Sequence, residues 1–197
     1  MRNTLWLISA LAFAQTLAGS IDPAAAQERQ LGAHEHGRGT LNMAVEGSRV
    51  SLELEAPGAD IVGFEHSART ARQKAALKQA KQQLLAPQSL FKFPSAAGCV
   101  VAEASVDIES GEHEHEHEIE KGAEGNKAEA AEEGHSNFHG QYAFNCKDPA
   151  RITAIEFGYF QAFAGAQKLE VNVITPKGQT RFDVTRAKAR IDLAGMM

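Results

Sequence analysis

The segment from Ser110 to Gly134 places the strongest constraint on how this chain can fold. It contains no aromatic residue and a single large aliphatic side chain, Ile119, and it is rich in Glu, Ala, Gly and His. So little apolar surface cannot offset the conformational entropy that ordering the segment would cost. We therefore expect a disordered loop here, and the hydrophobic core has to be built from the residues on either side of it.

The first residues have the pattern of a secretory signal peptide. Arg2 provides a positive start, residues 5–14 are largely apolar, and three alanines at 24–26 form a cleavage site before Gln27. The apolar run is shorter than the roughly 20 residues of a membrane-spanning helix, which disfavours a signal anchor. We expect a signal peptide over 1–26, no membrane insertion after its cleavage, and one domain over 27–197 that is large enough for a hydrophobic core.

The two cysteines, Cys99 and Cys146, flank the acidic loop. An even number of cysteines in an exported chain predicts one disulfide, which would close the base of the loop. In the chain-entropy model such a bond stabilises the fold by roughly 4 kcal/mol. The alternative is two free thiols or half of a zinc site.

Alternating apolar positions predict several strands. Residues 41–45 and 50–54 alternate on either side of a turn at 46–48, which indicates an antiparallel hairpin that ends at Pro57 and Gly58. Further strands are predicted from Cys99 to Ile108, from Phe138 towards Cys146, and over 169–173 and 180–184, where a turn at 176–178 joins the last two. An aromatic stretch over 152–163 predicts a strand followed by a short helix, and residues 185–193 fit a strand or a helix.

One long helix is predicted between Thr70 and Pro87. Thr70 and Gln73 form a capping-box pattern, and apolar residues recur at helical spacing until Pro87 ends the helix. We therefore predict an α+β fold, a single domain in which a mostly antiparallel β-sheet packs against one main helix. The polar side of the helix carries five cations and no acid, which is typical of a solvated face but could also dock the acidic loop or an acidic partner; the cations are Arg69, Arg72, Lys74, Lys78 and Lys81.

The histidines point to a metal. Residues 112–118 read EHEHEHE, so that His113, His115 and His117 alternate with carboxylates. Imidazole nitrogens and carboxylate oxygens suit divalent transition ions, zinc above all, and even a flexible cluster of this kind binds zinc, copper or nickel to some extent. The alternative is a solvated run of mixed charge. The formal net charge of −5 disfavours a nucleic-acid partner, which would need a basic face.

The remaining histidines lie outside the acidic loop. His34 and His36 flank Glu35, and in an extended segment both rings lie on one side and can share an ion. His66 follows Glu65 before the helix, where a lone histidine is more often an ordinary polar residue than a ligand. His135 and His139 follow directly after the loop, and their position makes them candidate ligands.

Three classes of function fit these ligands. A zinc-binding protein is favoured, and a protein that sequesters excess copper or nickel uses the same ligand types. A zinc metalloenzyme is less favoured, because the chain has no HExxH motif and no recognisable nucleophile motif. We therefore predict a protein that is not an enzyme and that binds Zn²⁺.

The order of motifs along the chain resembles a known family. It comprises HEHG at 34–37, the alternating run 41–45, Pro57, GFEH at 63–66, Cys99, a His- and Glu-rich insert, and finally His139, Tyr142, Phe144 and Cys146. This combination resembles the periplasmic zinc-binding proteins of the zinc-regulated ZrgA family over nearly the whole mature chain. The insert is shorter here and is diluted by Ala, Gly and Lys.

The resemblance implies a periplasmic protein that binds zinc and supports a high-affinity zinc ABC importer by delivering the ion to its solute-binding protein. It also implies ordered sites that draw on His34, His36, Glu65, His66 and His139, with the loop histidines as an accessory site. Glu35 and His135 remain candidates from the sequence pattern alone.

Overall fold

The computed structural model describes residues 37–110 and 135–197. The expected signal peptide and residues 111–134 of the expected loop lie outside the described residues. In chain order the elements are β1 (Arg38–Glu46), β2 (Arg49–Pro57), α1 (Gly58–Val62), α2 (Ala71–Leu84), α3 (Pro87–Leu90), β3 (Phe91–Lys92), a 3₁₀ turn (Ser95–Ala97), β4 (Cys99–Ser110), β5 (Ser136–Cys146), a second 3₁₀ turn (Pro149–Arg151), β6 (Ala154–Phe157), α4 (Tyr159–Ala162), β7 (Lys168–Thr175), β8 (Gly178–Thr185) and β9 (Arg190–Asp192).

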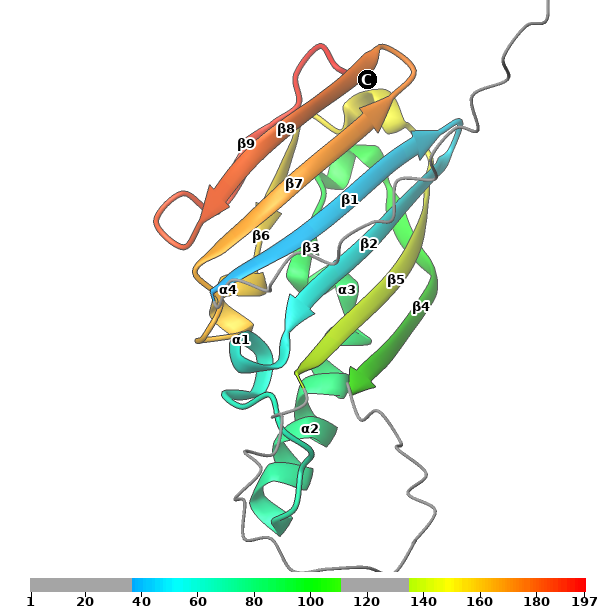
Figure 1. Cartoon of the computed structure of the whole chain (residues 1–197). Coiled ribbons are helices and arrows are strands. Elements are labelled where there is room, and N and C mark those ends of the chain that lie inside the picture. Colours follow the sequence, from blue (N-terminus) through cyan, green and yellow to red (C-terminus); the bar gives the residue numbers. More distant parts are fainter. Residues whose placement is uncertain (1–36, 111–134) are drawn as a thin grey trace, which may run out of the picture. The chain divides into compact units, whose positions relative to one another are not determined.

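A large sheet dominates the fold (Figure 1). Its six strands run in the order β4-β5-β2-β1-β7-β8, and every neighbouring pair is antiparallel except β1 and β7, which are parallel. A smaller antiparallel sheet has the order β3-β6-β9. The α+β prediction is confirmed, as are the hairpin of β1 and β2 and the strand and short helix formed by β6 and α4.

The hydrophobic core lies on one face of the large sheet. Alternation along β1 buries Leu41, Met43 and Val45 and leaves the intervening side chains on the opposite face. Strands β3 and β6 and helix α3 lie behind the large sheet in Figure 1, whereas α1 lies below its lower end. Aromatic side chains of the smaller sheet and of the α4 region supply much of the core, and the largest fully buried ones there are Phe91, Phe157, Tyr159, Phe160 and Phe163. Among the described residues, most side chains on the other face of the large sheet are polar and at least partly exposed, and we call it the open face.

Helix α2 forms as the sequence predicts. Thr70 accepts a hydrogen bond from the backbone N–H of Gln73, whose side chain in turn accepts one from the backbone N–H of Thr70. Only Ala80 and Leu84 of this helix are buried, so α2 adds less to the core than we expected from its length. Within the described ranges, no helix is both long and apolar enough to cross a membrane.

Strands β4 and β5 confirm the expected pairing around the acidic segment. Cys99 and Cys146 are opposite each other in the ladder and form a disulfide. At the other end of the same ladder Ser110 pairs with Ser136. A bulge between Val101 and Glu103 breaks the alternation that the sequence suggests for the start of β4, and both Val100 and Val101 are exposed.

Candidate metal centre

One end of the large sheet collects chain segments that are far apart in the sequence. The start of β1, the end of β2, the end of β4 and the start of β5 all lie there (Figure 1). Asn137 of β5 is in register with Pro57 of β2 on one side and with Glu109 of β4 on the other. Helix α1 begins directly after Pro57, and Gly58 packs so closely against the Ser136 hydroxyl that a side chain at position 58 would clash with it.

Gly37, the last residue of the HEHG motif, is anchored at this end of the sheet. Its backbone N–H donates a hydrogen bond of 2.6 Å to Oδ1 of Asp60, a carboxylate of α1 that is 3% exposed. Its carbonyl accepts from the backbone N–H groups of Gln167 and Lys168. Gly37 has a φ of +85°, a left-handed conformation that favours glycine. The HEHG motif therefore enters the fold beside α1.

The GFEH motif, residues 63–66, directly follows α1 in the chain. Gly63 caps the C-terminal end of α1: it has a left-handed φ of +83° and donates its N–H to the carbonyl of Ala59. The chain then presents Glu65, whose side chain is only 13% exposed. Nδ1 of His135 lies 2.5 Å from Oε2 of Glu65, although the two residues are 70 positions apart. The exposed His135 thus contributes its Nδ1–H to a carboxylate that is largely buried.

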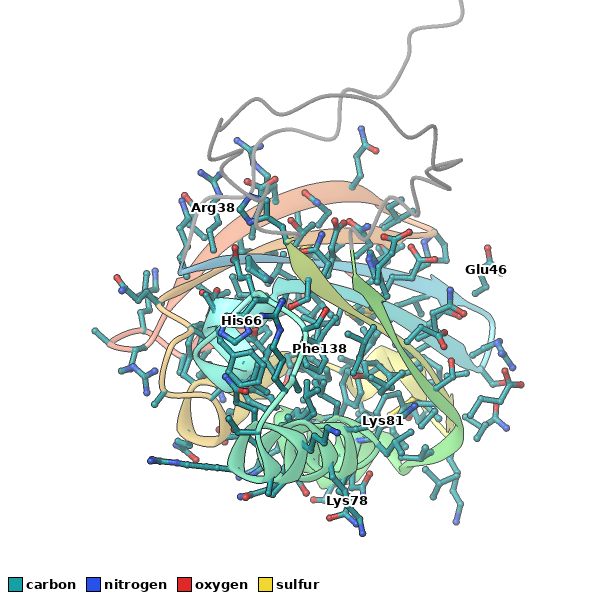
Figure 2. All side chains as sticks on the ribbon, turned by 60° about the horizontal axis from the view of Figure 1, so that its bottom comes forward. Arg38, Glu46, His66, Lys78, Lys81 and Phe138 are labelled. Atoms are coloured by element: carbon teal, nitrogen blue, oxygen red, sulfur yellow. A yellow bond between two sulfur atoms is a disulfide. The ribbon has the colours of Figure 1, made fainter. Side chains whose placement is uncertain are left out.

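His66 has different neighbours from Glu65. Its ring stacks on Phe64 with 5.1 Å between ring centroids, and Nδ1 is 3.1 Å from the carbonyl oxygen of Ser67. Nε2 is 3.4 Å from the side-chain nitrogen of Gln73 in the first turn of α2. The ring is exposed on the side of the domain that faces the viewer in Figure 2. His66 is therefore available to an ion but does not contact Glu65 or His135 through any hydrogen bond.

His139 occupies a second position, on the open face of the large sheet. Glu55 of β2 and Asp107 of β4 are its partners in register on either side. Nε2 of His139 lies 3.2 Å from Oε2 of Glu109, but the two atoms lack hydrogen-bond geometry, and this nitrogen is shielded from solvent with no hydrogen-bond partner among the described residues. Directly opposite residues of neighbouring strands share a face, so Glu55 and Asp107 lie on the same face of the sheet as His139, and Glu109 is the carboxylate in contact with its ring.

The described residues thus form two pairs rather than one completed metal site. Glu65 with His135 and Glu109 with His139 are brought together, and within residues 37–110 and 135–197 no three His, Cys, Asp or Glu side chains converge as a metal would require. A protein zinc site commonly uses four ligands, so neither pair by itself makes a complete one. Six other candidates lie outside the described residues, namely His34, Glu35, His36, His113, His115 and His117.

The sequence pattern does not reveal all the carboxylates that support these pairs. Asp60 lies inside an apolar run, where nothing in the local pattern shows that it anchors Gly37. Asp107 and Glu109 do carry a signal, because they alternate at the end of a predicted strand and so share a face. Their proximity to His139 depends on the register between β4 and β5, which the sequence does not specify.

Residues 33–193 of the chain match the model of the ZrgA family of zinc uptake proteins. The chain belongs to the ZrgA family. This match spans every candidate metal ligand from His34 to His139, and it associates this ZrgA protein with zinc and with zinc uptake, which is not a known enzymatic activity. A comparison with functionally curated proteins finds no match.

Proposed function

We propose that this ZrgA protein is exported to the periplasm, where it captures zinc and delivers it to the solute-binding protein of a high-affinity zinc ABC importer. The observation that carries the proposal is the contact between Glu65 and His135. A carboxylate that accepts the Nδ1–H of an imidazole orients the ring and leaves Nε2 directed to an ion, as in many zinc sites. Zinc is the cargo of this site rather than a permanent part of the protein.

The remaining ligands of the principal site are proposed to come from HEHG. Gly37 is held by Asp60 of α1, and Glu65 follows shortly after the end of α1, so the end of HEHG and the pair of Glu65 and His135 both adjoin α1. His66 is a further candidate ligand at the same end of the sheet. His139 with its carboxylates, and the loop histidines His113, His115 and His117, are proposed accessory sites for capture.

Histidine ligation makes the proposed function dependent on pH. Zinc binds neutral imidazole, and the unperturbed pKa of imidazole is about 6.5. The affinity for zinc should therefore fall when the medium is acidified through that range. Equal affinities about one pH unit above and below this value would contradict histidine ligation.

Calorimetric titration with zinc tests where the principal site lies. The mature chain is compared with a variant in which residues 111–134 are replaced by a short Gly–Ser linker, which the pairing of Ser110 with Ser136 allows without opening the sheet. We expect the variant to fold and to retain at least one zinc ion per chain. Loss of all binding would place the principal site inside the replaced segment.

Two further measurements complete the test. Replacing His34 and His36 together with alanine should weaken the site that remains in the linker variant, whereas an unchanged dissociation constant would remove HEHG from the ligand set. Delivery is tested by mixing the zinc-loaded chain with the purified, metal-free solute-binding protein of a zinc importer and measuring the zinc on each after separation. Retention of zinc by the donor would contradict the delivery step.

A further inference from the structure

The cations of helix α2, together with Arg69 just before it, make no contact within the described part of the chain that would explain them as part of the fold. Arg69, Arg72, Lys74, Lys78 and Lys81 are all exposed, and none of them forms an ion pair with any other described residue. Many cations elsewhere on the described surface do find acids, for example Arg49 with Glu103, Lys168 with Asp183 and Arg190 with Glu156. The charge on α2 is therefore directed to solvent or to another molecule.

Three of these cations form a stripe along one flank of the helix, which we call the lysine stripe: Lys74, Lys78 and Lys81. Their i, i+4 and i+7 spacing puts them on one side of α2 over about 10 Å. Figure 2 shows Lys78 pointing away from the body of the domain. The other flank of α2 is different, because Gln79, Gln82 and Gln83 line a neutral groove towards α4.

This charge arrangement destabilises α2 itself. Like charges at i, i+3 and i+4 repel each other, and the first turn of α2 contains no acid to balance Arg72 and Lys74 against the positive end of the helix dipole. Only Lys81, in the last turn, is favourably placed. A purely solvated face would be more stable with acids interspersed among the cations, so the absence of acids calls for an explanation outside the helix.

The lysine stripe starts beside the candidate metal centre. Gln73 immediately precedes Lys74, and its side-chain nitrogen lies 3.4 Å from Nε2 of His66. Glu65, which holds His135, is the residue before His66. A molecule bound along α2 would therefore have one end next to the residues that we propose to exchange zinc.

We infer that the lysine stripe docks the acidic rim of a zinc-accepting protein. The inference rests on the proposed function. A protein that receives zinc presents imidazoles and carboxylates around its own site, so its rim is negative at neutral pH. The acids of the present chain are concentrated between Glu112 and Glu133, whereas α2 carries cations and no acid, so an acidic partner is attracted at α2. Complementary charge of this kind accelerates association and orients the two proteins.

Charge reversal tests the docking surface. The triple variant Lys74→Glu, Lys78→Glu, Lys81→Glu is compared with a control that reverses Lys147, Lys177 and Lys188, which are exposed and lie outside α2. Both variants have the same net charge. The probe is the purified, metal-free solute-binding protein of a zinc importer, and the measurements are its affinity for the zinc-loaded chain and the rate of zinc transfer, at low and at high salt. Circular dichroism and the zinc content of each donor confirm that it is folded and loaded.

We expect the stripe variant to bind the probe at least tenfold more weakly than the control at low salt, and we expect high salt to remove the difference. Equal binding by both variants would overturn the docking inference while leaving delivery intact. Binding that depends on the stripe, without any zinc transfer, would support the docking surface and contradict the proposed delivery. Absence of binding by the unaltered chain would overturn the docking inference.

Two additional experiments test whether the lysine stripe binds a membrane or the chain's own residues 111–134 instead of a partner protein. If anionic phospholipid vesicles bind the unaltered chain and not the stripe variant, while the probe binds both equally, the surface belongs to a membrane and the inference is wrong. If the stripe matters only for contact with the chain's own residues 111–134, the linker variant and its stripe-reversed form will bind the probe equally. A tenfold difference between those two forms would support the docking inference.

Discussion

His135 and Glu65 are 70 residues apart in the chain, yet Nδ1 of the histidine lies 2.5 Å from Oε2 of the glutamate. The carboxylate is mostly buried and the imidazole is mostly exposed, with side-chain exposures of 13% and 68%. The buried partner fixes the ring, and the exposed partner can meet an ion from solvent. In this way the fold supplies a rigid support for His135, a candidate ligand that follows directly after the acidic segment.

Replacement of Glu65 by glutamine should weaken zinc binding by roughly 10- to 100-fold, the usual effect of removing a carboxylate that orients a metal-binding histidine. His135→Ala should have at least as large an effect, because it removes the ring nitrogen itself. The double variant should be no weaker than His135→Ala alone, since Glu65 acts through His135. Calorimetry on the linker variant measures all three, with the exposed Glu53→Gln as control. Additive losses would instead indicate that Glu65 binds zinc directly.

Asp60→Ala should affect both stability and zinc binding. It removes the carboxylate that accepts the Gly37 N–H and leaves this donor without that partner in a buried place, which costs about 1–3 kcal/mol of unfolding free energy. Loss of the anchor should also weaken zinc binding, because HEHG would no longer be held beside Glu65. Urea unfolding and zinc titration check the two effects, and the exposed Asp148→Ala provides the control. Reduced stability with unchanged affinity would show that the anchor does not position zinc ligands.

Removing the disulfide should lower stability without lowering zinc stoichiometry. Cys99 and Cys146 enclose 47 residue steps, for which the chain-entropy model predicts roughly 4 kcal/mol. The bond lies at the opposite end of the β4 and β5 ladder from Ser110 and Ser136, so the candidate metal centre should stay intact in Cys99→Ala, Cys146→Ala below its unfolding temperature. Thermal unfolding and zinc titration of this variant provide the check. A lost zinc ion would mean that cysteine sulfur takes part in binding.

Tyr159 should make the protein sensitive to alkali. Burial, with a further contribution from the Asp60 carboxylate, raises the pKa of Tyr159 above its ordinary value of 10.0. In the unfolded chain the phenol ionises near pH 10, whereas in the folded protein it stays protonated, so its contribution to stability is complete below that pH and is lost as the pH rises. Tyr159→Phe should therefore move the alkaline unfolding midpoint to higher pH.

The same variant should change stability little at pH 7, because the Tyr159 hydroxyl has no hydrogen-bond partner among the described residues. Circular dichroism at neutral and alkaline pH measures both effects. Tyr142 provides a comparison, since burial also raises the pKa of its phenol. A loss of more than about 1 kcal/mol at pH 7 in Tyr159→Phe would show that the hydroxyl is hydrogen-bonded in solution.

Local features of the fold could be predicted because they depend on neighbouring residues. The alternation of Leu41, Met43 and Val45 specifies which face of β1 is buried. The pattern of Thr70 and Gln73 specifies the start of α2, and Pro87 begins the next helical turn. The parallel pairing of β1 with β7 was not predicted, because it joins strands that are more than 100 residues apart. The alternation of apolar and polar residues along a strand also does not reveal whether its neighbour is parallel or antiparallel.

The sequence by itself determined the types of candidate metal ligand and their grouping along the chain, since these follow from side-chain chemistry, and the low apolar content of the acidic segment predicted that it stays out of the core. Only the tertiary structure decided which ligands meet. Strand register placed Glu109 beside His139, the turn after α1 brought Glu65 to His135, and buried Asp60 held Gly37 against α1. Such contacts arise from the packing of distant segments, where a shift of one residue would turn each side chain to the other face of its strand.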